Sequence, residues 1–223
     1  MRLALRRRLP EIEPLPERSD TLTVIANGPG ALQAPLDGRP TIALNGALKL
    51  FHGKCPPTYW AAFDAQPMVA EFVRDAPLGT TYLVGSKCCP AVFDNLAGRD
   101  VRLWHILSAP TQAMLKERWL VVPGVSITLT AFSLMRMLGY RKFDVWGWDG
   151  CFVDGKDHAV PQRHTKQDWD IEVGGRTFRS TTTWAAEGEE AVLRLRQGDY
   201  SVTVNGDGYF GALLRFLKVP AAA

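Results

Sequence analysis

A glycine-rich turn follows the first strongly apolar stretch of the sequence and constrains how the chain can fold. Residues 24–33 read VIANGPGALQ, an apolar run followed by Asn27, Gly28, Pro29 and Gly30. Glycines let the backbone approach a ligand closely, and Pro29 presets the φ angle of a first helical turn. Free N–H groups at a helix start suit a phosphate or a carboxylate. The stretch predicts a strand, a turn and a helix start, and the turn either binds a ligand or is a plain connection.

Strand patterns alternate with helix patterns along most of the chain. β-branched and apolar runs predict strands at residues 21–26, 41–44, 59–63, 80–84, 101–106 and 142–148. Helical spacing is found at residues 46–51, 67–74, 125–138 and 185–196, and residues 171–178 are typical of a hairpin with a glycine turn. Residues 200–217 contain a last strand, glycine turn and helix. Such alternation predicts an α/β fold with a mainly parallel sheet covered on both faces.

The composition along the chain suggests how it is divided. Residues 1–20 carry three prolines among mixed charges, which predicts an extended basic lead-in. Residues 21–223 are expected to form a single α/β domain. Within it, residues 150–170 form a polar stretch longer than compact domains usually tolerate. We interpret this stretch as a lid, with a structured insertion or an oligomer contact as the alternative.

Charge and hydropathy exclude some classes of protein. The formal net charge is +3, and four of the positive charges are Arg2, Arg6, Arg7 and Arg8, so the rest of the chain is nearly neutral. This argues against a nucleic-acid binder with a broad basic face. Neither a bilayer-spanning apolar run nor a signal peptide is recognisable, so we expect a cytoplasmic protein with four free cysteines. The oligomeric state does not follow from the sequence.

Four polar residues follow predicted strands, where ligands bind in parallel sheets. They are Asn27, Asn45, Asp64 and Asp149. A carboxamide is a neutral donor and acceptor suited to a ribose, a base or a phosphate, although either asparagine could simply stabilise its own turn. The two carboxylates could share a divalent cation or orient a sugar hydroxyl, and each could instead cap a helix.

The predicted lid carries His158 and His164, whose side chains suit proton transfer near neutrality. Asp154 and Asp157 could join them around a metal ion, but ligands scattered along a loop are weak support, and no metal site is predicted. Thr181, Thr182 and Thr183 could donate hydroxyls to a phosphate, and a helix cap is the simpler interpretation.

Three segments together resemble a known group of transferases. TVIANGPG and TIALNGA resemble the paired turn and strand-end asparagine motifs of bacterial sialyltransferases with a CMP-linked donor. ITLTAFSLMRMLGYRKFDVWGWDGCF resembles their long helix and the following strand that ends in Gly-x-Asp. The order of these motifs, with Asp64 and His158-Ala159, is similar to the domain shared by archaeal 6-hydroxymethylpterin diphosphokinases and motility-associated glycosyltransferases. The resemblance covers about residues 21–159 and implies a Rossmann-like three-layer fold with a lid-like insertion after the Gly-x-Asp strand.

The resemblance implies that a nucleotide or nucleotide-sugar donor binds at Asn27, Gly28, Pro29 and Asn45, with Asp64 and Asp149 near the transferred group. Gly30 stands where the sialyltransferase motif has a serine, and we include Gly30 and Asp64 in the predicted donor site. Our candidate catalytic residues are Asp149 and the two histidines of the predicted lid, His158 and His164. The expected function is sugar transfer from a nucleotide to an acceptor hydroxyl on a small molecule or glycan. One alternative is a diphosphokinase that uses ATP and Mg²⁺. Another is a nucleotide-binding scaffold without catalysis that binds a partner through its arginine-rich N-terminus.

Overall fold

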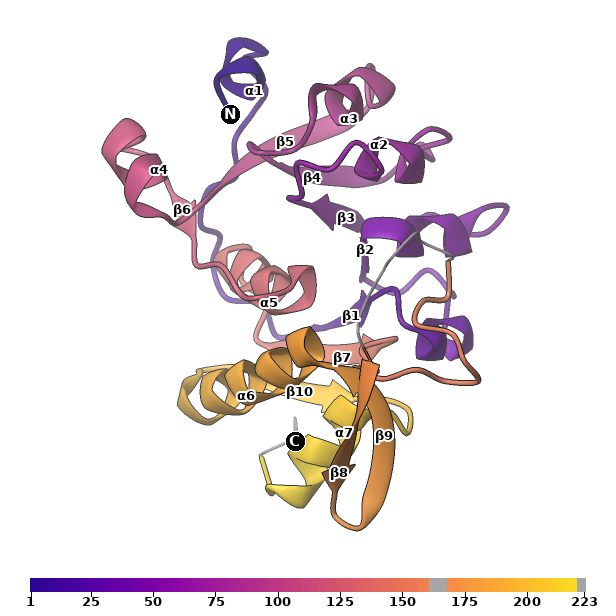
Figure 1. Cartoon of the computed structure of the whole chain (residues 1–223). Helices are drawn as coiled ribbons and strands as arrows, with labels where there is room; N and C mark the ends of the chain where they lie inside the picture. The colour runs from indigo at the N-terminus through magenta and orange to yellow at the C-terminus, as the bar shows by residue number, and fades with distance from the viewer. Residues whose placement is uncertain (161–167, 220–223) are drawn as a thin grey trace.

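The computed structural model describes residues 1–160 and 168–219, and its centre is an eight-stranded sheet (Figure 1). The strands lie in the order β10-β7-β1-β2-β3-β4-β5-β6, and every neighbouring pair is parallel. Their bounds are β1 Thr21–Ile25, β2 Thr41–Leu44, β3 Tyr59–Ala62, β4 Thr81–Gly85, β5 Asp100–Ile106, β6 Leu120–Val121, β7 Lys142–Trp146 and β10 Ser201–Val204. The predicted parallel α/β fold is confirmed.

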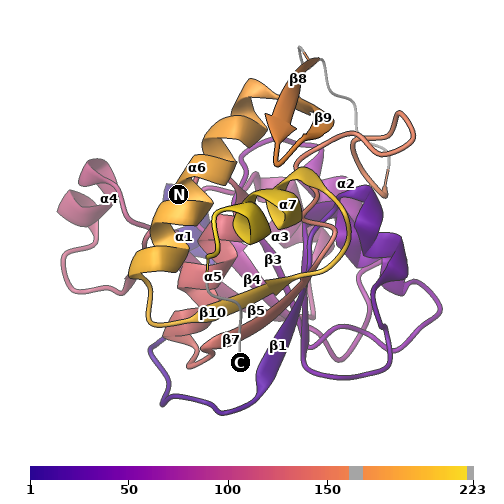
Figure 2. The same ribbon diagram turned by 90° about the horizontal axis from the view of Figure 1, so that it is seen from below.

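Helices cover both faces of this sheet, as Figures 1 and 2 show. One face packs against α5 (Ile127–Met137), α6 (Thr182–Gln197) and α7 (Tyr209–Phe216). The other packs against α1 (Arg2–Arg6), η1 (Pro29–Gln33), η2 (Asn45–Phe51), α2 (Val69–Phe72) and α3 (Pro90–Asn95), where η marks a 3₁₀ helix. Side chains of a strand alternate between the faces, so Val24 lies in one core cluster and Ile25 in the other. The three-layer arrangement follows from this two-sided burial.

Helix α5 is largely buried. Leu129, Phe132, Leu134 and Met135 are all buried, as expected for a helix that is apolar over most of its circumference. It begins at Ser126, whose hydroxyl accepts a hydrogen bond from the Leu129 N–H at 3.2 Å. Gly139 follows its end with a φ of 93°, a left-handed conformation that favours glycine. This confirms the helix predicted at residues 125–138, which is two residues shorter at its start and one at its end.

An insertion follows β7, as the sequence predicts. It ends in an antiparallel hairpin of β8 (Asp168–Val173) and β9 (Arg176–Thr181), with Gly174 and Gly175 at the turn in left-handed conformations. The hairpin packs against α6 and α7. The lid predicted at residues 150–170 is therefore irregular up to residue 160 and joins β8 at its end.

The N-terminal segment differs from the extended lead-in predicted for residues 1–20. Residues 2–6 form α1, whose Ala4 is buried in the core, and Arg7 pairs with Asp94 at 2.6 Å. From Pro10 onward the segment runs beside β5, where Glu11 forms a parallel bridge with Leu103 and the Ile12 N–H donates to the Leu103 carbonyl at 3.0 Å. The lead-in is thus part of the packed domain. The sequence reasoning also missed α3, β6 and α4 (Ala109–Met114), which are too short to show a clear period.

In the part of the chain that the structure describes, no helix combines the length and the apolar character needed to cross a bilayer.

Helix α6 begins at Thr181, which confirms the predicted threonine cap. Its hydroxyl accepts the Trp184 N–H at 3.2 Å. We predict that Thr181→Ala lowers the free energy of unfolding by about 1 kcal/mol, because a donor of the first turn loses its acceptor. Thr183→Ala, at an exposed position on the same turn, is the matched control and should change stability by less than about 0.5 kcal/mol in urea unfolding. Equal effects of the two variants would rule out the cap as the cause.

Candidate functional site

The candidate site lies at the carboxyl edge of the sheet, where the strand order reverses. From β1 the chain proceeds to β2 on one side, whereas β7 and β10 lie on the other side of β1. Loops that leave two neighbouring strands in opposite directions open a crevice between them, which is where open parallel sheets bind ligands. Here the crevice lies between the loops after β1 and β7, which begin near Asn27 and Gly147.

A pocket of about 150 Å³ occupies this crevice. Its lining includes four of the residues predicted from the sequence, namely Asn27, Gly28, Asn45 and His158. Three aromatic side chains also line it, Trp148, Trp184 and Phe210. The volume is smaller than the 300–1,000 Å³ usual for ligand sites, so this pocket encloses a sugar ring or a base and not a whole nucleotide-sugar. Aromatic walls suit either group.

Asn27 and Asn45 bring carboxamide oxygens into the pocket that lack a hydrogen-bond partner. Among residues 1–160 and 168–219, neither Oδ1 atom has one, although both atoms are buried. Asn27 is only 9% exposed, and its Nδ2 donates to the Val160 carbonyl at 3.3 Å. Leaving a buried acceptor unpaired costs about 1–3 kcal/mol. Two such acceptors facing one pocket favour a ligand that brings hydroxyl or amino donors.

The conformation of Asn45 explains why its side chain reaches this position. Its φ is 48°, in the left-handed region that asparagine tolerates better than most residues. Its carbonyl accepts the Trp60 indole N–H at 2.9 Å, which fixes the turn between β2 and η2. Asn45 thus both stabilises its own turn and lines the pocket, the two roles that the sequence left open.

The segment that covers the pocket is attached to it through Asn27 and carries an Asp–His pair. The Ala159 N–H donates to the Asn27 carbonyl at 2.7 Å. His158 Nδ1 lies 2.9 Å from Asp157 Oδ2, and both residues line the pocket. A carboxylate at one ring nitrogen orients the imidazole and stabilises its protonated form. His158 is therefore held in a position suited to accept a proton inside the pocket.

Glu187 of α6 is a pocket residue that the sequence reasoning missed. It is 4% exposed, and its Oε1 accepts the Ser126 hydroxyl at 2.5 Å and the Trp148 indole N–H at 2.6 Å. Glu187 thus joins the start of α5 to the aromatic wall. The sequence shows only a helix rich in Glu and Arg, in which Glu190 and Arg194 form a half-buried pair at 2.5 Å. Glu187 and Glu190 lie on the same side of α6 and both contact the start of α5, which only the packing of α6 reveals.

The first turn of α5 forms another wall of the pocket, through Ser126, Ile127 and Thr128. The first N–H groups of a helix have no acceptor within the helix and lie at the positive end of its dipole. The first turn of α5 holds no acidic residue. Two carboxylates of α6 also meet this helix start, because Glu187 accepts the Ser126 hydroxyl and Glu190 accepts the Val125 N–H at 2.9 Å. The N–H groups of the first turn can donate hydrogen bonds to an oxygen of a bound ligand.

The glycine turn predicted to hold a phosphate instead surrounds Asp149. The Gly30 N–H donates to Asp149 Oδ2 at 2.8 Å, and the Gly28 N–H donates to the Gly147 carbonyl at 2.8 Å. A Cβ atom at Gly28 would lie 2.4 Å from Asp149 Oδ2, and one at Gly30 would lie 2.7 Å from Oδ1. Both glycines are required by the close approach of this carboxylate. Asp149, Pro29 and Gly30 do not line the first pocket but a second cavity of about 410 Å³.

The remaining predicted residues lie elsewhere. Asp64 is exposed, and its Oδ1 accepts the Gln66 N–H at 2.9 Å, which closes a local turn. Its strand β3 is three strands from β7 in the sheet, a separation of roughly 14 Å, so Asp64 and Asp149 are too far apart to share a cation. His164 falls outside the described residues. Within those residues, no group of three or more His, Cys, Asp or Glu side chains is arranged to hold a metal ion.

Comparison with known proteins identifies a structural relative. No family model matches the sequence, and no curated protein matches it. A solved structure, the MAf glycosyltransferase from Magnetospirillum magneticum AMB-1, superposes with a TM-score of 0.67 over 90% of this chain at 16% sequence identity. The match covers 34% of that chain, so this protein spans about a third of its relative's length. At this identity the similarity establishes a shared fold.

Asp149 gives the site a pH dependence that can be measured. Burial raises the pKa of its carboxyl above the ordinary value of 3.8, and the Gly30 N–H offsets part of this shift. Stability is therefore full below the unfolded-state pKa and falls as the pH rises through the higher folded-state pKa. We predict that Asp149→Asn gains stability relative to the wild type as the pH rises from below 3.8 towards neutrality.

Urea unfolding across this pH range checks the prediction. The matched control is Asp154→Asn, which changes an exposed carboxylate of the same loop and should leave the pH profile unchanged. If the Asp149→Asn and wild-type profiles run parallel, the buried carboxylate does not titrate as described.

Proposed function

We propose that this protein is a glycosyltransferase that takes a sugar from a nucleotide-linked donor and transfers it to an acceptor hydroxyl. The observation that carries the proposal is the pair of buried, unpartnered oxygens of Asn27 and Asn45 in an aromatic-walled pocket beside Asp157 and His158. Sugars and ribose present several hydroxyl donors on a ring that stacks against aromatic side chains, which matches this lining.

We expect one orientation of the donor in the pocket. Its hydroxyls donate to the two asparagine oxygens, and its ring lies against Trp148 and Trp184. The leaving phosphate faces the first turn of α5, at the positive end of that helix. The two carboxylates of the same lining are held by protein donors, Glu187 by Ser126 and Trp148, and Asp157 by His158. Since the pocket holds about 150 Å³, the rest of the donor extends past the covering segment at residues 157–160.

The proposed reaction uses His158 as a general base. The acceptor oxygen bonds to the anomeric carbon of the donor sugar while the bond from that carbon to the phosphate oxygen breaks. The proton of the acceptor hydroxyl moves to His158, and the bonding electrons leave with the nucleotide phosphate. Asp157 stabilises the imidazolium that forms, and the N–H groups of α5 stabilise the released phosphate.

The fold relative supports this class of function, since it is a glycosyltransferase. The sequence resemblance points to a CMP-linked donor, which makes sialyl-type transfer the first donor to test. The diphosphokinase alternative needs a shared cation at Asp64 and Asp149, and the distance between their strands gives it no support. Nucleotide binding without turnover is the outcome that the scaffold alternative predicts.

The test is release of nucleotide from a panel of CMP-, UDP- and GDP-linked sugars, followed by chromatography. We expect release with at least one donor, and His158→Ala should lower the turnover by about 10²–10⁴-fold, because the acceptor loses its general base. Nucleotide binding should change little in this variant.

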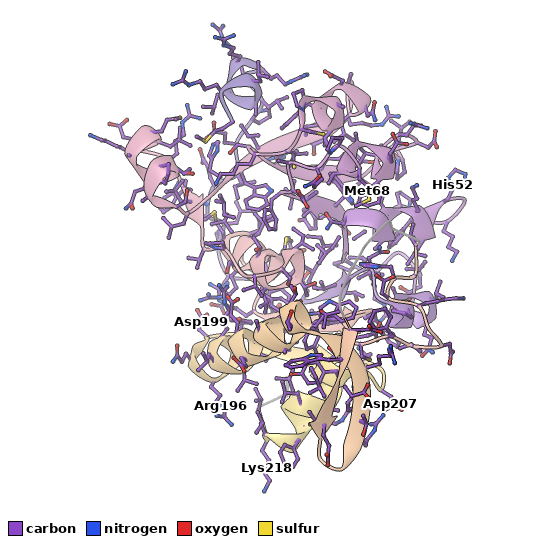
Figure 3. All side chains as sticks on the ribbon, viewed as in Figure 1. His52, Met68, Arg196, Asp199, Asp207 and Lys218 are labelled. Atoms are coloured by element: carbon purple, nitrogen blue, oxygen red, sulfur yellow. The ribbon has the colours of Figure 1, made fainter. Side chains whose placement is uncertain are left out.

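His52→Ala is the matched control. His52 is an exposed histidine at the rim of the molecule, on the loop after η2, where Figure 3 labels it. It should retain wild-type turnover. The proposal fails if no donor is turned over, and the role of His158 fails if turnover and nucleotide binding fall together.

A further inference from the structure

Three neighbouring strands end in glycine-containing turns at the same edge of the sheet. After β1 the sequence is Asn27-Gly28-Pro29-Gly30, after β7 it is Gly147-Trp148-Asp149-Gly150, and after β10 it is Asn205-Gly206-Asp207-Gly208. The first and third follow one pattern, Asn-Gly-x-Gly, on either side of the second. The function proposed above uses the first turn and leaves the third without a role.

The first and third turns approach the backbone and side chain of Asp149 so closely that Gly28, Gly30 and Gly208 leave no room for a Cβ atom. A Cβ atom at Gly208 would lie 2.6 Å from the Asp149 carbonyl oxygen, in addition to the contacts of Gly28 and Gly30 with its carboxylate. Gly206 is more distant, 3.9 Å from Oδ1 by the same measure. The carboxylate is 5% exposed and lies between the outer turns.

A cavity of about 410 Å³ opens beside this carboxylate. Pro29 and Gly30 line it from the first turn, Asp149 from the second, and Gly206, Asp207 and Gly208 from the third. Its volume lies within the range of small-molecule sites. It shares no lining residue with the first pocket.

The backbone of the first and second turns separates the two cavities, because consecutive residues of each turn line one cavity or the other. In the first turn, Gly28 faces the first pocket and the next two residues face the second cavity. In the second turn, Trp148 faces the first pocket and Asp149 the second cavity. The residues that line the two cavities are therefore only one or two positions apart in each turn.

A single loop segment covers both cavities. Val153, Asp154 and Lys156 line the second, whereas Asp157 and His158 line the first. Val153 and Lys156 exchange hydrogen bonds at 2.9 and 3.0 Å, which closes a tight turn. Its two central residues, Asp154 and Gly155, have φ values of 50° and 73°, as a type I′ turn requires. This turn fixes the side chains over the second cavity next to the proposed base.

The chemistry of the second cavity favours a carbohydrate. Three carboxylates, from Asp149, Asp154 and Asp207, outnumber the single ammonium of Lys156. Asp207, labelled in Figure 3, lies 3.6 Å from Arg176 and from Arg215, which partly balance its charge. Carboxylates repel a phosphate but accept hydrogen bonds from hydroxyls. The aliphatic surfaces of Pro29, Leu32 and Val153 suit the C–H face of a sugar ring.

We infer that this second cavity binds the acceptor, a neutral glycan or glycoside, next to the donor pocket. The inference rests on the proposed function, because it gives the proposed transfer a second substrate site. The acceptor hydroxyl would reach over the wall at Gly28 and Trp148 towards His158. Asp149 and Lys156 would hold the other hydroxyls of the sugar.

Amide NMR spectra of the ¹⁵N-labelled full chain test the inference without requiring turnover. The probes are the methyl glycosides of glucose, galactose, mannose and N-acetylglucosamine, titrated at millimolar concentration. We expect at least one to shift the amide signals of Gly30, Gly206 and Gly208 saturably. Leu32→Trp, which fills the cavity from an exposed position, should weaken this binding by at least about tenfold.

Leu78→Trp is the matched control, because Leu78 is also exposed and lines neither cavity. It should bind the glycoside as the wild type does. The inference is overturned if no glycoside shifts the three glycine amides, if the shifts occur at Asn27 and Asn45 instead, or if Leu32→Trp binds with wild-type affinity.

Nucleotides titrated into the same labelled protein separate the two proposals. Signals of Asn27 and Asn45 that move with a nucleotide, in the wild type and in Leu32→Trp, support the donor pocket independently. Glycoside shifts without any nucleotide shift would refute the proposed transferase and leave a carbohydrate site in the second cavity.

Discussion

The carboxylate of Asp149 is the group around which the functional edge of this protein is built. It is buried at the end of β7 and accepts the Gly30 N–H. The turns after β1 and β10 must both be glycine-rich to reach it, since side chains at Gly28, Gly30 and Gly208 would collide with Asp149. The requirement determines the path of the backbone that separates the two cavities. A turn that looks in sequence like a phosphate site thus serves first to enclose a carboxylate of the protein itself.

The chemistry of the first pocket depends on which polar groups remain available to a ligand. With the N–H groups of Gly28 and Gly30 donated to acceptors within the protein, the pocket presents the side chains of Asn27 and Asn45 and the first turn of α5. Hydroxyl donors and a leaving phosphate would thus be held by different walls. Such a division is what transfer from a nucleotide-sugar needs, because the bond that breaks lies between these two groups.

Local sequence patterns predicted the fold well where the elements are long or strongly apolar. Strand β2 has the predicted bounds, α5 ends at Met137 shortly before the predicted Gly139, and Thr181 caps α6. Some short elements, such as β6 and α3, were missed because they contain too few residues for a clear period. Most of these short pieces are held by tertiary packing and not by propensity.

The site was only partly predictable for a different reason. Asn27, Asn45 and His158 were identified because each follows a strand or lies in a polar loop, and the structure brings them together. The partner of the Gly30 N–H lies 119 residues away in the chain, so no local pattern reveals it. Glu187 was not identified, because its burial depends on how α6 packs over α5 and no local pattern shows it.

The most direct test of the donor pocket is thermal unfolding of the full chain with CMP, CDP, UDP, GDP or ATP, each with and without Mg²⁺. A nucleotide at about a hundred times its dissociation constant stabilises the folded state by roughly 2.7 kcal/mol. The account predicts stabilisation by at least one nucleotide without metal, and its loss in Asn45→Ala. No stabilisation by any nucleotide, or stabilisation only by ATP together with Mg²⁺, would contradict it.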